Sequence, residues 1–137
     1  MKLSNTSEYA IRILGFMARE PERKFSAKYM VEKLKISDKY LRRILTSLTK
    51  SGIIISTQGR EGGYAFQKKI QDIFLSDIID VTEGMEKYMG CVLGFSECSD
   101  SNPCAFHKEW VKARVTMIQS FKNTSLADLS LTGNIKF

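Results

Sequence analysis

Several kinds of residue and segment are scarce in this chain of 137 residues. Histidine and tryptophan occur once each, proline twice and cysteine three times. The sequence contains no run of about 18 apolar residues, the length that a membrane-spanning helix requires, so we expect no membrane partner. Glu8 and Arg12 interrupt the N-terminal stretch, which therefore lacks the apolar core of a secretory signal. These absences predict a cytoplasmic protein whose thiols stay reduced.

Charge is divided unevenly along the chain, although the total is +6. Residues 1–70 contain 15 Lys/Arg and 6 Asp/Glu, a net charge of +9, whereas residues 71–137 contain 6 and 9, a net charge of −3. Basic surfaces are common on soluble proteins. A basic half joined to an acidic half nevertheless indicates that the first half alone meets a polyanion such as nucleic acid.

The basic half contains the pattern of a helix-turn-helix. A 3.6-residue apolar period predicts a helix over residues 4–19. Ser26 is a good N-cap for a short helix over residues 27–34, and Ser37 is a good N-cap for a second helix that ends before Gly52. Two helices joined by so short a turn form a motif whose second helix enters the major groove of DNA.

A β-hairpin is predicted directly after this motif. Residues 53–57 form a β-branched run, residues 58–63 include three glycines, and residues 64–66 return as the partner strand. A hairpin in this position is a wing. Arg60 at its tip is expected to reach a minor groove or the DNA backbone.

The second helix of the motif turns polar and charged side chains toward solvent. We expect those near its N-terminus to reach base edges and the others to meet phosphates. They are Ser37, Asp38, Lys39, Arg42, Arg43, Ser47 and Lys50. The alternative is a solvated, charged helix face.

All three cysteines and the only histidine lie in one window of the acidic half. Cys91, Cys98, Cys104 and His107 follow the spacing C-x6-C-x5-C-x2-H. Thiolate and imidazole are the ligands that soft transition metals select, and an odd number of cysteines fits disulfides poorly. The window is therefore predicted to hold a metal or a metal cluster.

Three other chemistries remain open for this window. Three cysteines and a histidine are a standard tetrahedral set for structural zinc. A metal-free thiol sensor could instead form a reversible disulfide between Cys98 and Cys104. Cys104 and His107 could act as nucleophile and base, but no third orienting residue is recognisable, so we do not expect an enzyme.

A long helix is predicted after the cysteines, opened by Pro103 and ended by Asn123. Ser76 is expected to cap a shorter helix before them, over residues 77–82. One apolar stripe of the long helix consists of Phe106, Trp110, Ala113, Met117 and Phe121. Further apolar residues lie on a second side, so the helix needs two partners, its own core and a second subunit. Burial within one domain is the alternative.

The combination of these motifs resembles the winged-helix repressors of the Rrf2 family, in its iron–sulfur branch of IscR-like and NsrR-like members. The resemblance begins at Met1-Lys2-Leu3 and covers about 130 residues. It rests on the helix pattern S-x2-Y-L-x2-I-L-x2-L-x3-G-I-I from Ser37, the wing pattern G-x2-G-G-Y from Gly59, the three cysteines, and Leu126-Ala127-Asp128-Leu129.

This resemblance implies a mainly α fold with a small β-hairpin wing. Residues 1–70 would form a winged helix-turn-helix, and residues 71–137 a cluster-binding loop and a long C-terminal dimerisation helix. The implied protein is a homodimer that binds a double-stranded DNA operator. In it the stripe from Phe106 to Phe121 packs against the second subunit.

The resemblance also implies an iron–sulfur cluster, 2Fe–2S or 4Fe–4S, in each subunit. Cys91, Cys98 and Cys104 correspond to its cysteine ligands. The fourth ligand would be His107, as in IscR-type members, or Glu8 donated by the partner subunit, as in some NsrR-like members. Such a cluster would gate operator binding in response to nitric oxide, oxygen or iron–sulfur status.

On the DNA side, Ser37 and Tyr40 match the recognition helix of the family. Arg42 replaces a glutamate of IscR-type members, and Gln58 replaces their wing arginine. The operator is therefore expected to differ from theirs, with Arg60 taking over the reach of the wing.

Overall fold

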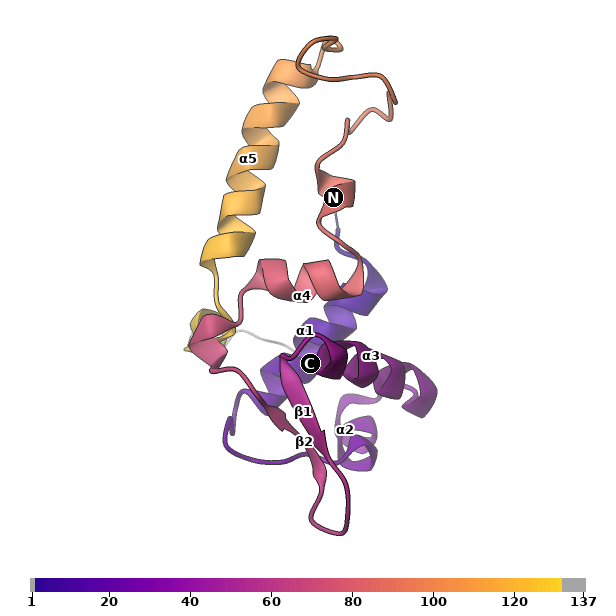
Figure 1. Ribbon diagram of the computed structural model, residues 1–137, viewed down its shortest axis with the longest axis vertical. Helices are drawn as coiled ribbons and strands as arrows, with labels where there is room; N and C mark the ends of the chain where they lie inside the picture. The colour runs from indigo at the N-terminus through magenta and orange to yellow at the C-terminus, as the bar shows by residue number, and fades with distance from the viewer. Residues whose placement is uncertain (1, 132–137) are drawn as a thin grey trace.

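The computed structural model describes residues 2–131, which form a mainly helical fold with one two-stranded hairpin (Figure 1). The elements follow in the order α1 (Asn5–Met17), α2 (Ala27–Leu34), α3 (Asp38–Lys50), β1 (Ile54–Thr57), β2 (Gly63–Phe66), η1 (Ile70–Asp72), α4 (Leu75–Thr82), η2 (Glu86–Tyr88), α5 (His107–Asn123) and α6 (Leu126–Leu131). The predicted fold class is confirmed. Within the described range, no helix is both long and apolar enough to cross a membrane.

Serine caps define the helices of the DNA-binding half. Ser4, Ser26 and Ser37 each accept a hydrogen bond from the backbone N–H three residues ahead, which satisfies a donor that the first helical turn leaves free. Between α2 and α3 the chain turns at Lys35, in the left-handed conformation with φ of 58°. Gly52, with φ of 83°, follows α3, as predicted.

The apolar faces of the helices meet in one core. It takes four residues from α3 and the inner face of α1 (Leu41, Ile44, Leu45, Leu48, Ala10, Ile13, Leu14 and Met17). Ile73, Ile78 and Leu126, from beyond residue 70, belong to the same core. The second half is thus packed onto the first, and the division at residue 70 stays a prediction.

The wing is an antiparallel hairpin that extends beside α2 and α3 at the lower end of Figure 1. Its register pairs Ile54 with Phe66 and Thr57 with Gly63. The turn is tight at Gly62, where a Cβ atom would lie 2.1 Å from the carbonyl oxygen of Thr57. A glycine is therefore required there for steric reasons.

Two predicted helix starts are wrong. Helix α4 begins at Leu75 and not at Asp77. The carboxylate of Asp77 accepts a hydrogen bond of 2.9 Å from the N–H of Phe74, which makes Phe74, two residues before Ser76, the N-cap. Helix α5 begins at His107 and not at Pro103, because the N–H of Cys104 points to the sulfur of Cys98 at 3.4 Å and residues 104–107 form a turn first. Its predicted end at Asn123 is confirmed.

Helix α5 stands apart from the core and is the longest element in Figure 1. Helix α4 lies between it and the DNA-binding half, and residues 89–106 form the loop at the top. The lower end of α5 is tied to the start of α4, because the N–H of Leu75 donates to the carbonyl of Thr124 at 3.0 Å. None of the residues of α5, all of them within the described chain, is buried.

Candidate metal centre and DNA-binding surface

The three cysteines that are dispersed over fourteen residues of sequence come together in space. The Sγ atoms of Cys91, Cys98 and Cys104 all lie within 4.8 Å of one another. The distance between Cys91 and Cys104 is 3.8 Å, and all three residues are half-buried free thiols. The loop is therefore folded so that its sulfurs converge on one point.

The imidazole of His107 lies beside this group, at the first residue of α5. Its Nδ1 is 3.3 Å from the Sγ of Cys98, and its Nε2 is 2.9 Å from Oδ1 of Asp100. Metal-bound histidines commonly place their second ring nitrogen against a carboxylate, which fixes the tautomer and the orientation of the ring. Asp100 therefore holds Nδ1 toward the sulfurs. Sequence reasoning missed this residue, because its side chain is 97% exposed in an irregular loop and nothing in the spacing marks it.

The thiols differ in acidity. A hydrogen bond from the backbone N–H of Phe95 is the main reason that the pKa of Cys91 is lowered to about 7. The N–H of Cys104 lowers the pKa of Cys98 in the same way, but burial and the two neighbouring thiols outweigh it, so the pKa of Cys98 is raised. Of Cys91 and Cys98, Cys91 is thus the thiol that more readily supplies the thiolate that metals bind.

These residues fit a thiolate-bound metal. Sulfurs bound to one tetrahedral zinc at 2.3 Å lie about 3.8 Å apart, which is the separation of Cys91 and Cys104. Cysteine thiolates are equally the ligands of iron–sulfur clusters. A hollow of about 260 Å³ adjoins the sulfurs, and Met89, His107, Trp110 and Arg114 contribute to its lining.

Glu8, the alternative ligand, lies elsewhere in the chain. It is in the first turn of α1 and forms an ion pair of 3.3 Å with Lys2. Within the described chain, the ligand group around the sulfurs consists of the three cysteines and does not include Glu8. Its donation from a partner subunit stays a prediction.

The predicted DNA-binding residues lie on α3 and the wing, at the end of the molecule opposite the cysteines (Figure 1). Most are exposed: Ser37, Asp38, Lys39, Arg42, Arg43, Lys50, Gln58 and Arg60. Arg42 is paired with Asp38 at 2.9 Å, one helical turn away. Tyr40 is half-buried and faces α1, where its hydroxyl is hydrogen-bonded to that of Thr6 at 2.5 Å.

The predicted dimerisation stripe divides into two parts. Trp110 donates from its indole nitrogen to the carbonyl of Gly90 at 2.8 Å, and Phe121 packs edge-on against Tyr88. These two contacts lie within the chain. The other part is more accessible to a second subunit. Phe106 is 40% exposed, Ala113 is exposed, and Met117 is half-buried.

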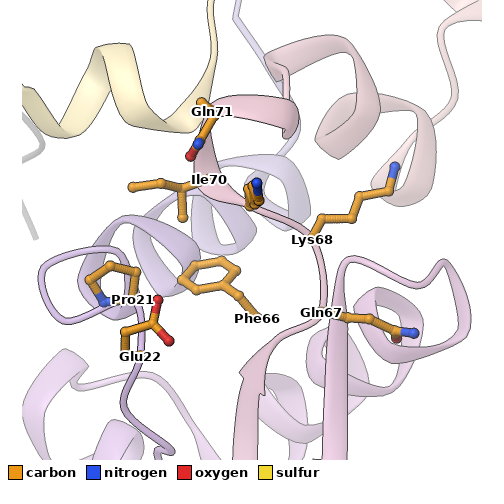
Figure 2. Close-up of a pocket in the computed structure, with 8 residues that line it drawn as sticks. Pro21, Glu22, Phe66, Gln67, Lys68, Ile70 and Gln71 are labelled. Carbon is orange, nitrogen blue, oxygen red and sulfur yellow. The ribbon is translucent and has the colours of Figure 1, made fainter.

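A second hollow, of about 420 Å³, lies at the base of the wing, and no cysteine contributes to its lining (Figure 2). The side chains of Pro21, Phe66 and Ile70 lie near one another, whereas those of Lys68 and Gln67 extend away from Phe66 (Figure 2). Its polar side chains do not converge on one point, so we assign it no ligand.

Known proteins match this chain along nearly its whole length. The Rrf2 family, described as an iron-dependent transcriptional regulator, matches residues 3–131. Protein rrf2 of Nitratidesulfovibrio vulgaris is 33% identical over 137 residues, which cover 94% of this chain and 87% of that protein. The HTH-type transcriptional regulator NsrR of Geobacillus kaustophilus is 29% identical, with 94% and 89% covered.

Solved structures show the same fold. CymR, the global cysteine regulator of Bacillus subtilis, has a TM-score of 0.80 at 24% identity and covers 96% of this chain and 98% of its own. The oxidized form of Staphylococcus aureus CymR has a TM-score of 0.74 at 28% identity, with 95% and 96% covered. IscR of T. potens has a TM-score of 0.67 at 24% identity, with 100% and 93% covered.

Proposed function

Because the chain belongs to the Rrf2 family of transcriptional regulators, we propose that it is a homodimeric DNA-binding repressor whose operator binding is gated by an iron–sulfur cluster. The cluster, one per subunit, would be held by Cys91, Cys98 and Cys104. His107 is the favoured fourth ligand, with Glu8 of the second subunit as the alternative. The proposed signal is nitric oxide, oxygen or iron–sulfur status, and the proposed place of action is the cytoplasm.

One observation carries this proposal: the three sulfurs converge beside the first residue of α5. A cluster at this point would supply iron that reacts with nitric oxide or oxygen, or that is lost. Cys104 lies three residues before His107, and the backbone N–H of His107 donates to the carbonyl of Cys104 at 3.1 Å. Any change in how these two side chains are held therefore acts first on the start of α5.

The geometry of DNA makes operator binding sensitive to the position of α5. A dimer that reads two half-sites must hold its recognition helices about 34–36 Å apart. If α5 forms the interface between subunits, its position sets the separation of the two copies of α3. A displacement of α5 is then expected to weaken operator binding without any change in the DNA-contacting residues.

The test begins with protein purified without oxygen and assayed for iron, sulfide, zinc and visible absorption. A duplex selected by the wild-type protein from a random-sequence pool then serves as the operator. We expect brown protein with iron and sulfide near stoichiometric amounts, and different operator affinities for the loaded and metal-free forms at fixed salt. Equal affinities for the two forms would contradict gating.

The fourth ligand is tested separately by matched variants. His107→Ala and Glu8→Gln are reconstituted side by side and compared for retained iron and for the visible spectrum. We expect the histidine variant to lose iron faster than wild type, because Nδ1 already points to the sulfurs. Loss in the Glu8 variant alone would assign the ligand to the partner subunit.

The sulfur separation of 3.8 Å also favours a second candidate, a structural zinc site in the same DNA-binding regulator. Colourless protein with about one zinc per chain would support it. Colourless protein without metal would instead favour the thiol sensor.

A further inference from the structure

Glu83, the residue that follows α4, is an acidic side chain with an unusual set of partners. The side chain is only 6% exposed. Its Oε1 accepts hydrogen bonds of 2.5 Å from both the hydroxyl of Tyr88 and the ammonium of Lys87. Its Oε2 accepts from the N–H of Ser4 at 2.9 Å and from the hydroxyl of Ser7. Both oxygens are therefore fully used.

The two oxygens face different parts of the molecule. Oε2 holds the first turn of α1, in the DNA-binding half, whereas Oε1 holds η2, which ends three residues before Cys91. The carboxylate is not needed to begin α1, because the hydroxyl of Ser4 already caps that helix. Burying a charged carboxylate is costly unless hydrogen-bond donors surround it. Since α1 is capped without Glu83, the four donors around this carboxylate indicate a role other than helix capping.

On the side of the cysteines, the residues that follow Glu83 contact helix α5. The carbonyls of Met89 and Gly90 accept hydrogen bonds from Arg114 and Trp110 of α5, at 2.5 and 2.8 Å. The ring of Tyr88 packs edge-on against Phe121 of the same helix. Residues 88–90 are thus fixed to α5 immediately before the first cysteine.

On the side of the DNA, the first turn of α1 contacts the recognition helix. The hydroxyl of Thr6 is hydrogen-bonded to that of Tyr40 at 2.5 Å, and the ring of Tyr9 meets the ring of Tyr40 edge-on, with centroids 5.4 Å apart. Tyr40 lies in the first turn of α3. Three consecutive contacts therefore connect the segment before Cys91 with α3. Residues 88–90 contact Glu83, Glu83 contacts α1, and α1 contacts Tyr40.

We propose that Glu83 is the positioning residue that couples the cysteine-containing loop to the recognition helix, through Tyr88 on one side and Ser4 and Ser7 on the other. This inference rests on the proposed function, since it assigns a route to the proposed gating. Glu83 is neither one of the candidate metal ligands nor one of the predicted DNA-binding residues. Its role is to keep α1 in one position for as long as residues 88–90 stay in theirs.

Tyr88→Phe is the sharpest variant, because it removes only the hydroxyl that reaches Glu83 and keeps the ring on Phe121. Glu83→Gln is the second variant. Ser130→Ala is the control, because within residues 2–131 its hydroxyl bonds to its own helix, at the carbonyl of Leu126. Melting temperatures and metal content are measured for all three.

Coupling is measured in both directions, because linkage is reciprocal. The first readout is the ratio of operator affinities of metal-loaded and metal-free protein. The second is the rate at which a thiol reagent labels the cysteines of the metal-free protein, with and without the selected duplex. We expect DNA to change the labelling rate about fivefold or more in wild type and Ser130→Ala, and less than about twofold in Tyr88→Phe.

Retention of both the affinity ratio and the DNA effect in Tyr88→Phe and Glu83→Gln would overturn the inference. Wild type could instead show equal operator affinities with and without metal, together with an effect of DNA on the labelling rate that Tyr88→Phe removes. This result would contradict metal gating but support the coupling. If wild type shows neither effect, both proposals fail. A variant that only loses stability shifts its melting temperature and leaves both readouts in place, which also overturns the coupling role.

Discussion

At the scale of single residues, two acidic side chains decide how the candidate site is built. Asp100 orients the imidazole of His107 from the solvent side, and Glu83 accepts hydrogen bonds from two segments of chain, the start of α1 and η2. Neither is a metal ligand in this arrangement. Asp100 contacts the candidate ligand His107, whereas Glu83 holds η2, which ends three residues before Cys91.

Asp100→Asn tests the orienting contact. An amide is a weaker acceptor than a carboxylate and leaves the tautomer of His107 unfixed, so we expect the affinity for metal to fall about 10–100-fold. Zinc is a suitable probe, in competition with a chromophoric chelator. Glu97→Gln is the matched control, because it removes one exposed charge from the same loop. Equal affinities in the two variants would show that the contact of Asp100 does not matter.

Glu83→Gln should reveal a dependence of stability on pH. Burial alone would raise the pKa of Glu83, but donors from Lys87, Ser7, Tyr88 and Ser4 outweigh it and hold the pKa well below the ordinary 4.5. Because the folded pKa is depressed, the stabilisation is present above pH 4.5 and is lost as the pH falls toward the folded value. At pH 7 we expect the variant to lose about 1–3 kcal/mol of unfolding free energy.

The measurement is urea unfolding of wild type and Glu83→Gln from pH 7 downward. The difference between them should stay constant to about pH 4.5 and then shrink. For Glu97→Gln the difference from wild type should be small throughout. A difference for Glu83→Gln that does not change with pH would exclude ionisation as its origin.

The cysteines and His107 could be predicted from sequence because their chemistry is rare and their spacing is short. Asp100 and Glu83 could not. Exposed acids are frequent in any sequence, and the partners of Glu83 at Ser4 and Ser7 are 79 and 76 residues away. Contacts over such distances follow from packing of the elements, which no local pattern records.

At the scale of elements, local chemistry predicts helix ends well where one cap is available and poorly where two compete. Ser26 and Ser37 stand alone before their helices, and both predicted caps are confirmed. Ser76 competes with Asp77, whose longer side chain reaches back to the N–H of Phe74. Pro103 is compatible with a first helical turn. The backbone N–H of Cys104 is instead directed toward the sulfur of Cys98, and the helix begins only at His107.

The wing offers a prediction at this scale. Gly62→Ala places a methyl group 2.1 Å from a backbone oxygen, so the turn must open, at a cost of about 1–3 kcal/mol. We expect a lower melting temperature and weaker binding to the selected duplex, since Gln58 and Arg60 lie in the same turn. Glu61→Ala is the control, because it changes an exposed residue of the same turn without adding a group beside the backbone. Similar losses in both variants would contradict the steric argument.

At the scale of the whole molecule, helix α5 has no buried residue, which supports the proposed packing of α5 against a second copy of the chain. Ala113 is exposed on it, so the isolated subunit should tolerate Ala113→Glu, whereas an interface should not. We expect wild type to sediment as a dimer and the variant as a folded monomer with much weaker operator binding. Lys108→Glu, also exposed on α5, serves as the control. A variant that remains dimeric would place the interface on another face.

The base of α5 is attached to the start of α4, and this attachment has a mechanical consequence. Its 17 residues span about 25 Å, with His107 at the far tip and Thr124 tied to Leu75 at the base. Over such a lever arm, a tip movement of about 0.2 Å, the size of a changed bond length, turns the base by less than about 1°. Release of the tip by about 5 Å turns it by roughly 11°. Because this rotation is proportional to the displacement of the tip, small adjustments at the candidate metal centre would leave the base of α5 almost in place, whereas release of a ligand would rotate it appreciably.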